Sequence, residues 1–251
     1  MDKILAIDAG NTRVKWALFN ADGTLLESNS CLNTAITQAK LPVAKRIVIS
    51  NVAGMHIKNQ LESLLPEEAS INWVTAQASA CGVNNSYDHP GKLGTDRWAA
   101  LIAAWHIKQT SCVVVNAGTA LTIDALNDQG DFIGGMILPG IHLMQASLGV
   151  ATAQLPSITS EKTASVVNIH EQAIFAKNTE DAMRAGAISA ACGAILQMHG
   201  ALSDHCKQNP YILMSGGNAQ LIKDNLLGDM TNRILIVDNL VLRGLYHIEN
   251  Y

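Results

Sequence analysis

Two stretches of the chain show the same order of apolar and polar positions. Residues 4–7 form one apolar run and residues 113–115 form another, and each run is followed by a glycine turn. Beyond the first turn, Val14, Trp16 and Leu18 alternate with other residues. An alternation with a period of two is typical of a strand with one buried face. The pattern therefore predicts strand, tight turn and strand in both places.

The two stretches match when the sequence is shifted by 108 positions. Residues 5–12 then fall on residues 113–120, and Ala17-Leu18 falls on Ala125-Leu126. Each copy then reaches another glycine turn, at Asp22-Gly23 in the first copy and at Gln129-Gly130 in the second. Glycine takes positive φ at no steric cost in such a turn. Self-similarity over several elements in the same order indicates an internal duplication.

A second match, at a shift of 165 positions, covers a strand, a small-residue turn and an amphipathic helix. It places residues 47–50 on residues 212–215. The difference between the two shifts leaves 57 extra residues in the second half, which helical patterns around 141–149 and 170–204 fill.

The chain is thus expected to form two α/β halves of one plan, each a mixed sheet flanked by helices, with a ligand cleft between them. We place the halves at residues 1–110 and 111–251, the second with a helical insertion at about 141–205.

Composition narrows the class of protein. The 251 residues are 48% hydrophobic and 15% charged, with a formal net charge of -4, so a large core is expected and a basic nucleic-acid footprint is not. The apolar stretches fall short of the ~20 residues of a membrane span, and no signal peptide is expected. Five scattered cysteines without a C-x-x-C pair favour free thiols and a cytoplasmic location.

The two glycine turns are candidate phosphate sites. In residues 8–12, glycine allows close approach to an anion, Thr12 offers a hydroxyl and Asp8 is suited to a hydrated Mg²⁺. Lys15 adds a point charge, and residues 116–119 repeat the device in the second half. A single turn of this kind is most often a plain hairpin, but a pair in register indicates two loops that bind one polyphosphate.

Duplicated halves with a phosphate turn in each resemble the acetate and sugar kinase, heat-shock ATPase and actin superfamily. That resemblance implies two ribonuclease-H-like domains with ATP between them. Residues 215–219 occupy the place of the superfamily's adenosine-contacting turn, and a plain strand-to-helix turn is the alternative interpretation.

The segment of residues 87–97 leads into a helix rich in alanine and leucine. Thr95 or Asp96 is suited to capping that helix, whatever its function. Arg97 is a cation in the first helical turn, which the helix dipole disfavours, so it indicates an anionic partner such as a substrate carboxylate or phosphate. An ionised Asp at a helix start suits a base that takes a proton from an attacking hydroxyl.

With these segments in place, the sequence resembles a type III pantothenate kinase over essentially its whole length. The matching segments are 8–12, 87–97, 117–120 and 178–179, and residues 94–97 are the most specific of them. The resemblance implies a homodimer that phosphorylates pantothenate with Mg²⁺ and ATP, in the first step of coenzyme A synthesis. It also implies an acceptor pocket built partly across the subunit interface.

The resemblance assigns roles residue by residue. Asp96 is the implied proton acceptor, and Asp8 holds Mg²⁺ through water. The residues expected to contact ATP are Asp8, Ala9, Gly10, Asn11, Thr12, Arg13, Val14, Lys15 and Thr119. Those expected to contact pantothenate are Tyr87, Gly94, Thr95, Asp96, Arg97 and Thr179.

One position departs from the family pattern. The family usually has Asp where this chain has Asn116, and the carboxylate helps to bind a monovalent cation such as K⁺ or NH₄⁺. A neutral amide offers an oxygen without the charge, so kinase activity is expected to survive while potassium dependence is in question. Two other functions stay open at this stage: a non-catalytic regulatory protein of the Bvg accessory factor type, and a kinase for another small alcohol.

Overall fold

The computed structural model describes residues 3–151, 174–226 and 232–251. They form two compact units and two mixed sheets, and the second sheet, in the order β12-β11-β8-β9-β10-β7-β6, takes β6 and β7 from unit 1. Unit 1 comprises residues 1–109, 129–134 and 239–251, and unit 2 comprises residues 110–128 and 135–238.

The sheet of unit 1 has five strands in the order β3-β2-β1-β4-β5. β1 pairs antiparallel with β2 and parallel with β4, so the sheet is mixed. The strands are β1 (Ile4–Ala9), β2 (Arg13–Phe19), β3 (Leu25–Leu32), β4 (Arg46–Asn51) and β5 (Ser70–Trp73). The hairpin between β2 and β3 turns at Gly23, whose φ of 84° confirms the predicted glycine turn.

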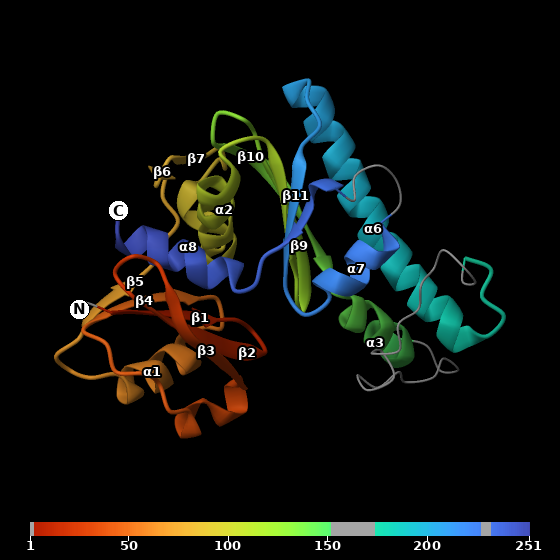
Figure 1. Cartoon of the computed structure of the whole chain (residues 1–251). Helices are drawn as coiled ribbons and strands as arrows, with labels where there is room; N and C mark the ends of the chain where they lie inside the picture. The colour runs from red at the N-terminus through yellow and green to blue at the C-terminus, as the bar shows by residue number, and fades with distance from the viewer. Residues whose placement is uncertain (1–2, 152–173, 227–231) are drawn as a thin grey trace. The chain divides into compact units, whose positions relative to one another are not determined.

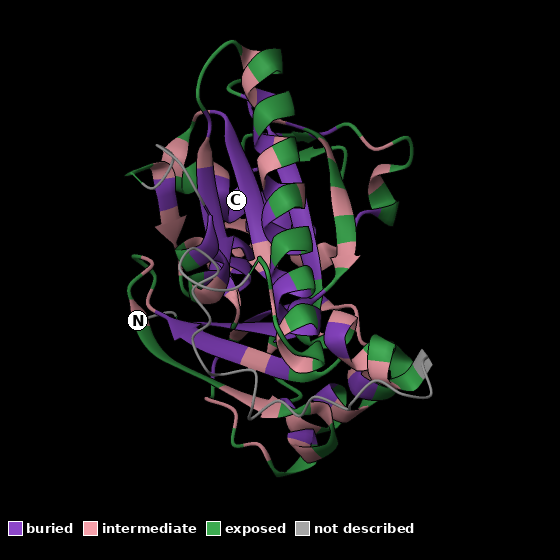
Figure 2. Ribbon diagram, turned by 90° about the vertical axis from the view of Figure 1, so that its right-hand side faces the viewer, coloured by how far each residue is buried: buried purple, intermediate pink, exposed green. Residues whose placement is uncertain are grey.

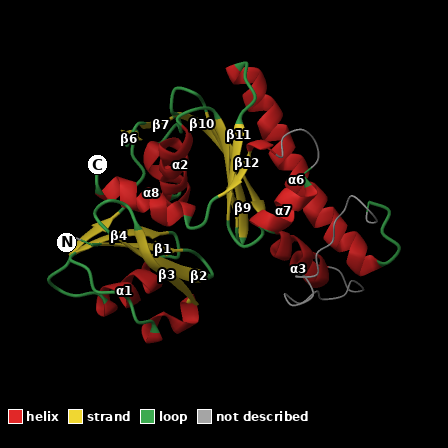
Figure 3. Cartoon of the chain, viewed as in Figure 1, coloured by secondary structure: helices red, strands yellow, loops and turns green. Residues whose placement is uncertain are grey.

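Helices cover both faces of this sheet, as Figures 1 and 3 show. α1 (Met55–Leu64) packs against one face, where Ile57 and Leu61 join the core residues of β1 and β4. α2 (Thr95–Lys108) and α8 (Leu240–Glu249) pack together and contact strands of the sheet. The remaining elements of this unit are the 3₁₀ helices η1 (Asn33–Gln38) and η2 (Pro90–Lys92) and the short strands β6 (Ser79–Ala80) and β7 (Val83–Asn85).

β2 differs from the half-buried strand that its alternation predicts. From Trp16 to Phe19 every residue is buried, the members of both faces included. Phe19 packs against Tyr246 of α8 with ring centroids 5.2 Å apart. The second face is buried because a helix more than 200 positions away in the sequence covers it, which a local pattern does not reveal.

The sheet of unit 2 repeats this plan. β8 pairs antiparallel with β9 and parallel with β11, and β12 follows β11 in parallel. The strands are β8 (Cys112–Ala117), β9 (Ala120–Leu126), β10 (Asp131–Pro139), β11 (Tyr211–Ser215) and β12 (Ile234–Ile236). β10 runs through both units, because its first residues pair with β7 in unit 1.

Three described helices belong to unit 2: α3 (Ile141–Ala151), α6 (Thr179–Cys206) and α7 (Ala219–Asn225). α3 and α6 lie in the predicted insertion at about 141–205, of which residues 152–173 lie outside the described part of the chain, and α7 follows it. α6 is long and apolar enough to cross a membrane by length and composition alone. Its residues Ile188 and Ile195 are buried in the core with β8 and β9, and buried and exposed residues alternate along it in Figure 2. A core helix passes the same test, so no span follows from it.

The strand registers show how the duplication is built. β1 corresponds to β8 at the predicted shift of 108, and β4 corresponds to β11 at the predicted shift of 165. In both units an amide beyond the strand end donates to the equivalent alanine carbonyl: Val52 to Ala9 at 3.0 Å, and Asn218 to Ala117 at 3.1 Å.

The predicted match of Ala17-Leu18 with Ala125-Leu126 is wrong by one position. Ala9 pairs with Val14, whereas Ala117 pairs with Leu121, so the second turn is one residue shorter. β2 and β9 therefore correspond at a shift of 107.

The compact units also differ from two contiguous halves divided near residue 110. Residues 129–134 and 239–251 pack with unit 1. The reason lies in α8, which contacts α2 closely: a side chain on Gly244 would overlap the backbone of Ala99.

Candidate active site

A row of polar side chains crosses the sheet of unit 1 where β1 and β4 end. Lys15 of β2 and Ser50 of β4 both pair in register with Asp8 of β1. Directly paired residues place their side chains on the same face of a sheet. On β1 the residues of the opposite face, Leu5 and Ile7, belong to the α1 core, so this row lies on the face of α2.

Asp8 is an unusual member of this row. Asp8 is 8% exposed, and no group in the described part of the chain donates a hydrogen bond to its Oδ1. Burial and the charge of Asp96 raise the pKa of Asp8 to about 7, although Lys15 acts in the opposite direction. A buried, unpaired carboxylate oxygen destabilises a fold, so its presence points to a cation or proton that completes it.

The first turn of α2 lies against this row. Thr95 is its first residue, and its Oγ1 lies 2.8 Å from Ser50 Oγ. The N-cap is Gly94, so the capping role predicted for Thr95 or Asp96 is wrong in detail. Asp96 nevertheless satisfies one amide of the first turn, because its Oδ1 accepts a hydrogen bond of 2.8 Å from Arg97 N.

Gly94 gives the Asp96 carboxylate the space it occupies. A Cβ atom at Gly94 would lie 2.6 Å from Asp96 Oδ1. Asp96 is half-exposed, and its Oδ2 accepts no hydrogen bond from the described residues. This oxygen is thus available to a proton donor from outside the chain.

Arg97 lies beside a pair of aromatic rings, Tyr87 and Phe132, whose centres are 5.2 Å apart. It is 5% exposed, donates a hydrogen bond of 2.8 Å to the hydroxyl of Tyr87 and lies 5.6 Å from the centre of that ring. Phe132 faces the guanidinium from 5.8 Å. Cation–π contacts of this kind stabilise a buried cation, and they account in part for an arginine at a helix start.

The loop that carries Tyr87 is organised by a buried amide. Asn85 Oδ1 accepts a hydrogen bond from Tyr87 N at 3.1 Å, and its Nδ2 donates to the carbonyls of Pro90 and Gln77. These three hydrogen bonds of Asn85 hold the segment that leads into α2, and they fix the position of Tyr87 in it.

The first glycine turn, from Gly10 to Arg13, is open to solvent at its tip. Asn11, Thr12 and Arg13 are exposed, while Ala9 and Val14 on either side are buried. Asn33 donates hydrogen bonds of 3.0 Å to the carbonyls of both Gly10 and Asn11. Two carbonyl oxygens of the turn thus accept hydrogen bonds from one side chain.

The turn of unit 2 has a neutral row in place of the charged one. Asn116 pairs in register with Thr122 of β9 and Ser215 of β11, and it is half-exposed. Thr119 is exposed at the tip, and its carbonyl accepts a hydrogen bond of 2.9 Å from Gly140 N. Thr119 is therefore held at a turn equivalent to that of residues 10–13.

Thr179 lies at the start of α6 in unit 2. It is exposed, and the preceding Asn178 caps the helix by accepting a hydrogen bond of 2.9 Å from Asp181 N. Capping by Asn is worth about 1 kcal/mol and fixes where a helix begins, and so here the place of Thr179.

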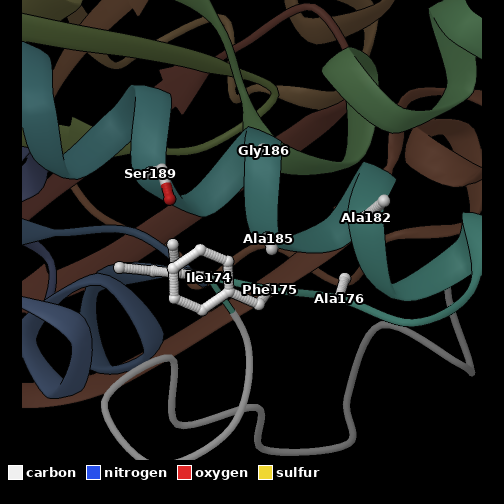
Figure 4. A pocket seen from close by; sticks show the side chains of 7 residues that line it. All are labelled: Ile174, Phe175, Ala176, Ala182, Ala185, Gly186 and Ser189. Carbon is white, nitrogen blue, oxygen red and sulfur yellow. The ribbon is translucent and has the colours of Figure 1, made fainter.

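A cavity of about 300 Å³ lies beside the same end of α6, as Figure 4 shows. It is lined by Ile174, Phe175, Ala176, Ala182, Ala185, Gly186 and Ser189. None of these seven described residues carries an acidic or basic side chain.

The structure thus brings together the residues that unit 1 contributes to the predicted site: Asp8, Lys15, Thr95 and Asp96, with Arg97 and Tyr87 next to them. Asn116, Thr119 and Thr179 belong to unit 2. Ser50, Asn33 and Asn85 were not predicted from the sequence. Their signal was weak, because a single Ser or Asn at a strand end is common.

The chain is similar to known proteins over most of its length. Residues 4–201 match the family model described as type III pantothenate kinase. A type III pantothenate kinase from Nitrosospira multiformis is 39% identical over 250 residues, covering 98% of this chain and 90% of the relative. One from Aromatoleum aromaticum is 40% identical over 248 residues, covering 96% of each chain.

A solved structure supports the fold. The protein from Campylobacter jejuni described as a conserved Baf family transcriptional activator superposes with a TM-score of 0.62 at 20% identity, covering 98% of this chain and 97% of that one. The predicted fold is confirmed: this is a duplicated, ribonuclease-H-like α/β fold with a mixed sheet flanked by helices in each unit. The regulatory alternative receives no support from the curated relatives, which carry the kinase name.

Proposed function

Because this chain belongs to the type III pantothenate kinase family, we propose that Asp96 is the proton acceptor of its reaction. The chain is a kinase that phosphorylates pantothenate with ATP, in coenzyme A biosynthesis. The observation that carries the proposal for Asp96 is its place, in the first turn of α2 and close enough to Asp8 to raise the pKa of that carboxyl.

The chemistry follows from this placement. The pantothenate hydroxyl loses its proton to Asp96 as its oxygen attacks the γ-phosphorus of ATP. A new phosphorus–oxygen bond forms, the bond to the β-phosphate oxygen breaks, and ADP leaves with the electron pair. Positioning and charge stabilisation supply most of the catalysis in such a transfer. Asp96 suits this role because its carboxylate is fixed by Gly94 and the amide of Arg97.

We propose that Asp8 holds Mg²⁺ through water. The fit rests on the unpaired, buried Oδ1 of Asp8, which has the hard oxygen character that Mg²⁺ prefers. When bound, Mg²⁺ neutralises charge on the phosphates. Lys15, the neighbour of Asp8 across the hairpin, adds a second positive charge for the triphosphate.

The nucleotide is proposed to contact both glycine turns. In unit 1 these contacts come from the backbone and side chains of residues 8–15, whose tip is exposed. In unit 2 they come from Thr119, also exposed. Glycine in each turn allows the phosphates to approach the backbone.

Pantothenate carries a carboxylate at one end and a primary hydroxyl at the other. We propose that residues 94–97, Tyr87 and Thr179 bind it, with the guanidinium of Arg97 as the positive charge of the pocket. The hydrogen bond and ring contact between Arg97 and Tyr87 support a shared role for these two residues.

A homodimer that works in the cytoplasm is the form we propose for the active enzyme. Unit 2 exposes several large apolar side chains on β10 and α3, which a second copy would cover: Ile137, Leu143, Leu148 and Val150. The five cysteines are free thiols, as expected in a reducing compartment.

Asn116 is the proposed monovalent-cation position, with a changed donor. Its amide oxygen is neutral and the residue is half-exposed, so it lacks the buried charge of Asp8. We propose that K⁺ or NH₄⁺ is bound weakly here or by other oxygens.

The test of the base is Asp96→Asn, which keeps shape and removes the basic oxygen. We expect turnover to fall by roughly 10²-fold or more, the scale of general-base loss, with ATP binding and the unfolding temperature retained. The measurement is ADP release with and without pantothenate. Turnover close to the wild type in this variant would rule out Asp96 as the base.

A further inference from the structure

Ser50 ties the first turn of α2 to the sheet. It lies at the end of β4 with 0% of its surface exposed, and its Oγ is 2.8 Å from Thr95 Oγ1. The bond joins two residues 45 positions apart, one on the sheet and one on the helix that carries Asp96.

This contact is the one side-chain hydrogen bond that either hydroxyl makes within the described ranges. A buried hydroxyl is costly without a partner, so Ser50 holds Thr95 in place. Ser50 also pairs in register with Asp8. The bond therefore sets the position of the first helical turn relative to the Asp8 carboxylate.

We propose that Ser50 is a positioning residue for phosphoryl transfer, which acts through Thr95 to keep the Asp96 carboxylate beside Asp8. This rests on the proposed role of Asp96 as the proton acceptor. A displacement of about 1 Å from the productive geometry can cost on the order of 10²-fold in rate. The body of α2 is held independently by the buried Trp98 and Leu101, so the loss of one hydroxyl frees the first turn and leaves the helix in place.

The first experiment measures pantothenate phosphorylation by the intact chain carrying Ser50→Ala. We expect kcat to fall about tenfold while KM for ATP and for pantothenate stays within about twofold. The reason is that a misplaced Asp96 carboxylate weakens stabilisation of the transition state, whereas the binding of the substrates does not depend on it. Ser111→Ala is the matched control: Ser111 is 1% exposed, and its Oγ bonds to no group in the part of the chain that the structure describes. The control is expected to keep the kcat of the wild type.

The second experiment tests whether Ser50 acts through Thr95. Thr95→Val removes the partner hydroxyl at a half-buried position and should lower kcat by a similar factor. In that background, Ser50→Ala should cause no further loss, since residues that act as one unit are not additive. Thr95→Val also carries the test if Ser50→Ala fails to fold, and it is then judged by kcat alone, because the proposed contact of Thr95 with pantothenate bears on KM.

Two results would overturn the proposal: a kcat for Ser50→Ala equal to that of Ser111→Ala, or a full additional loss in the Thr95→Val background. The Asp96→Asn variant separates this failure from that of the proposed base. If Asp96→Asn is inactive and Ser50→Ala is not impaired, the positioning role alone is wrong. If Asp96→Asn keeps wild-type turnover, both are wrong.

Discussion

The two units have equivalent rows of three residues at their strand ends, one row charged and the other neutral. In unit 1 the row is Lys15, Asp8 and Ser50, and in unit 2 its counterpart is Thr122, Asn116 and Ser215. The backbone is alike in both, down to the amide that donates to the alanine carbonyl beyond each strand end. Charge is what differs: one row holds a cation and an anion, and the other is neutral.

The comparison supports the proposal that these charges serve a ligand. The neutral row is compatible with the same strands, turn and register, so the architecture does not require Asp8 or Lys15. Asp8 is buried, with an oxygen that lacks a partner among the described residues, and burial raises its pKa from 3.8 to about 7. Groups that reduce stability in this way cluster at functional sites.

Asp8→Asn makes the row of unit 1 resemble that of unit 2 and carries the largest expected effect. We expect kcat/KM for ATP to fall by roughly 10²–10³-fold, because the oxygen proposed to hold Mg²⁺ through water loses its charge. The measurement is a titration of ATP and of Mg²⁺ in the coupled assay. A variant that retains normal activity at ordinary Mg²⁺ concentrations would contradict the assignment.

Gly216→Ala and Gly54→Ala compare the glycines that follow β11 in unit 2 and β4 in unit 1. A Cβ at Gly216 would lie 2.5 Å from the carbonyl oxygen of Ala117, in addition to a φ of 99°. Gly54, after the equivalent strand of unit 1, has a φ of 87° but nothing within 4 Å of the added atom. We expect Gly54→Ala to cost about 1 kcal/mol of unfolding free energy and Gly216→Ala several times more.

Denaturant unfolding of both glycine variants gives the comparison, with the wild type as reference. Equal losses of unfolding free energy would show that the backbone around Gly216 adjusts to the added methyl group at no greater cost than the backbone around Gly54.

The pH dependence of stability distinguishes the rows without any substrate. The pKa of Asp8 is raised from 3.8 to about 7 in the folded chain. The contribution of Asp8 to the free energy of unfolding is therefore fully present below pH 3.8 and is lost as the pH rises through 7. Asp8→Asn removes this loss. We expect the variant to gain on the order of 2–4 kcal/mol over the wild type at pH 8 and little at pH 4.5.

Thermal unfolding at both pH values, without nucleotide or Mg²⁺, measures this difference. A gain of this size corresponds to several degrees for a chain of this length. A constant difference between variant and wild type across the pH range would refute the buried, protonated state of Asp8.

Asn116→Asp makes the row of unit 2 resemble that of unit 1 and has the smallest expected effect on activity. We expect K⁺ or NH₄⁺ to stimulate the variant several-fold more than the wild type, since a carboxylate binds a cation better than an amide does. Activity is compared with K⁺, with NH₄⁺ and with neither. Sharp K⁺ dependence of the wild type itself would defeat the idea of a weakened site.

The sequence predicted the duplication because apolar strands, glycine turns and their order are local signals. It missed the one-residue difference between the two turns, because an Ala-Leu pair in each strand matches at a shift of 108 although the strands correspond at 107. It also missed Ser50, whose meaning depends on Thr95 across the fold. Asp96 and Arg97 were found because they lie within one distinctive segment, whereas the aromatic partner Phe132 is 35 positions away from Arg97.

The placement of α8 bears on how the polypeptide matures on the ribosome. About 130 residues separate the end of α2 from the start of α8, and the whole of unit 2 is synthesised within that interval. Until α8 emerges, Phe19 and the alanine-rich side of α2 are exposed. The unit that is synthesised first is thus completed last, and a nascent chain that stalls before residue 240 holds its first glycine turn on a sheet that α8 does not yet cover.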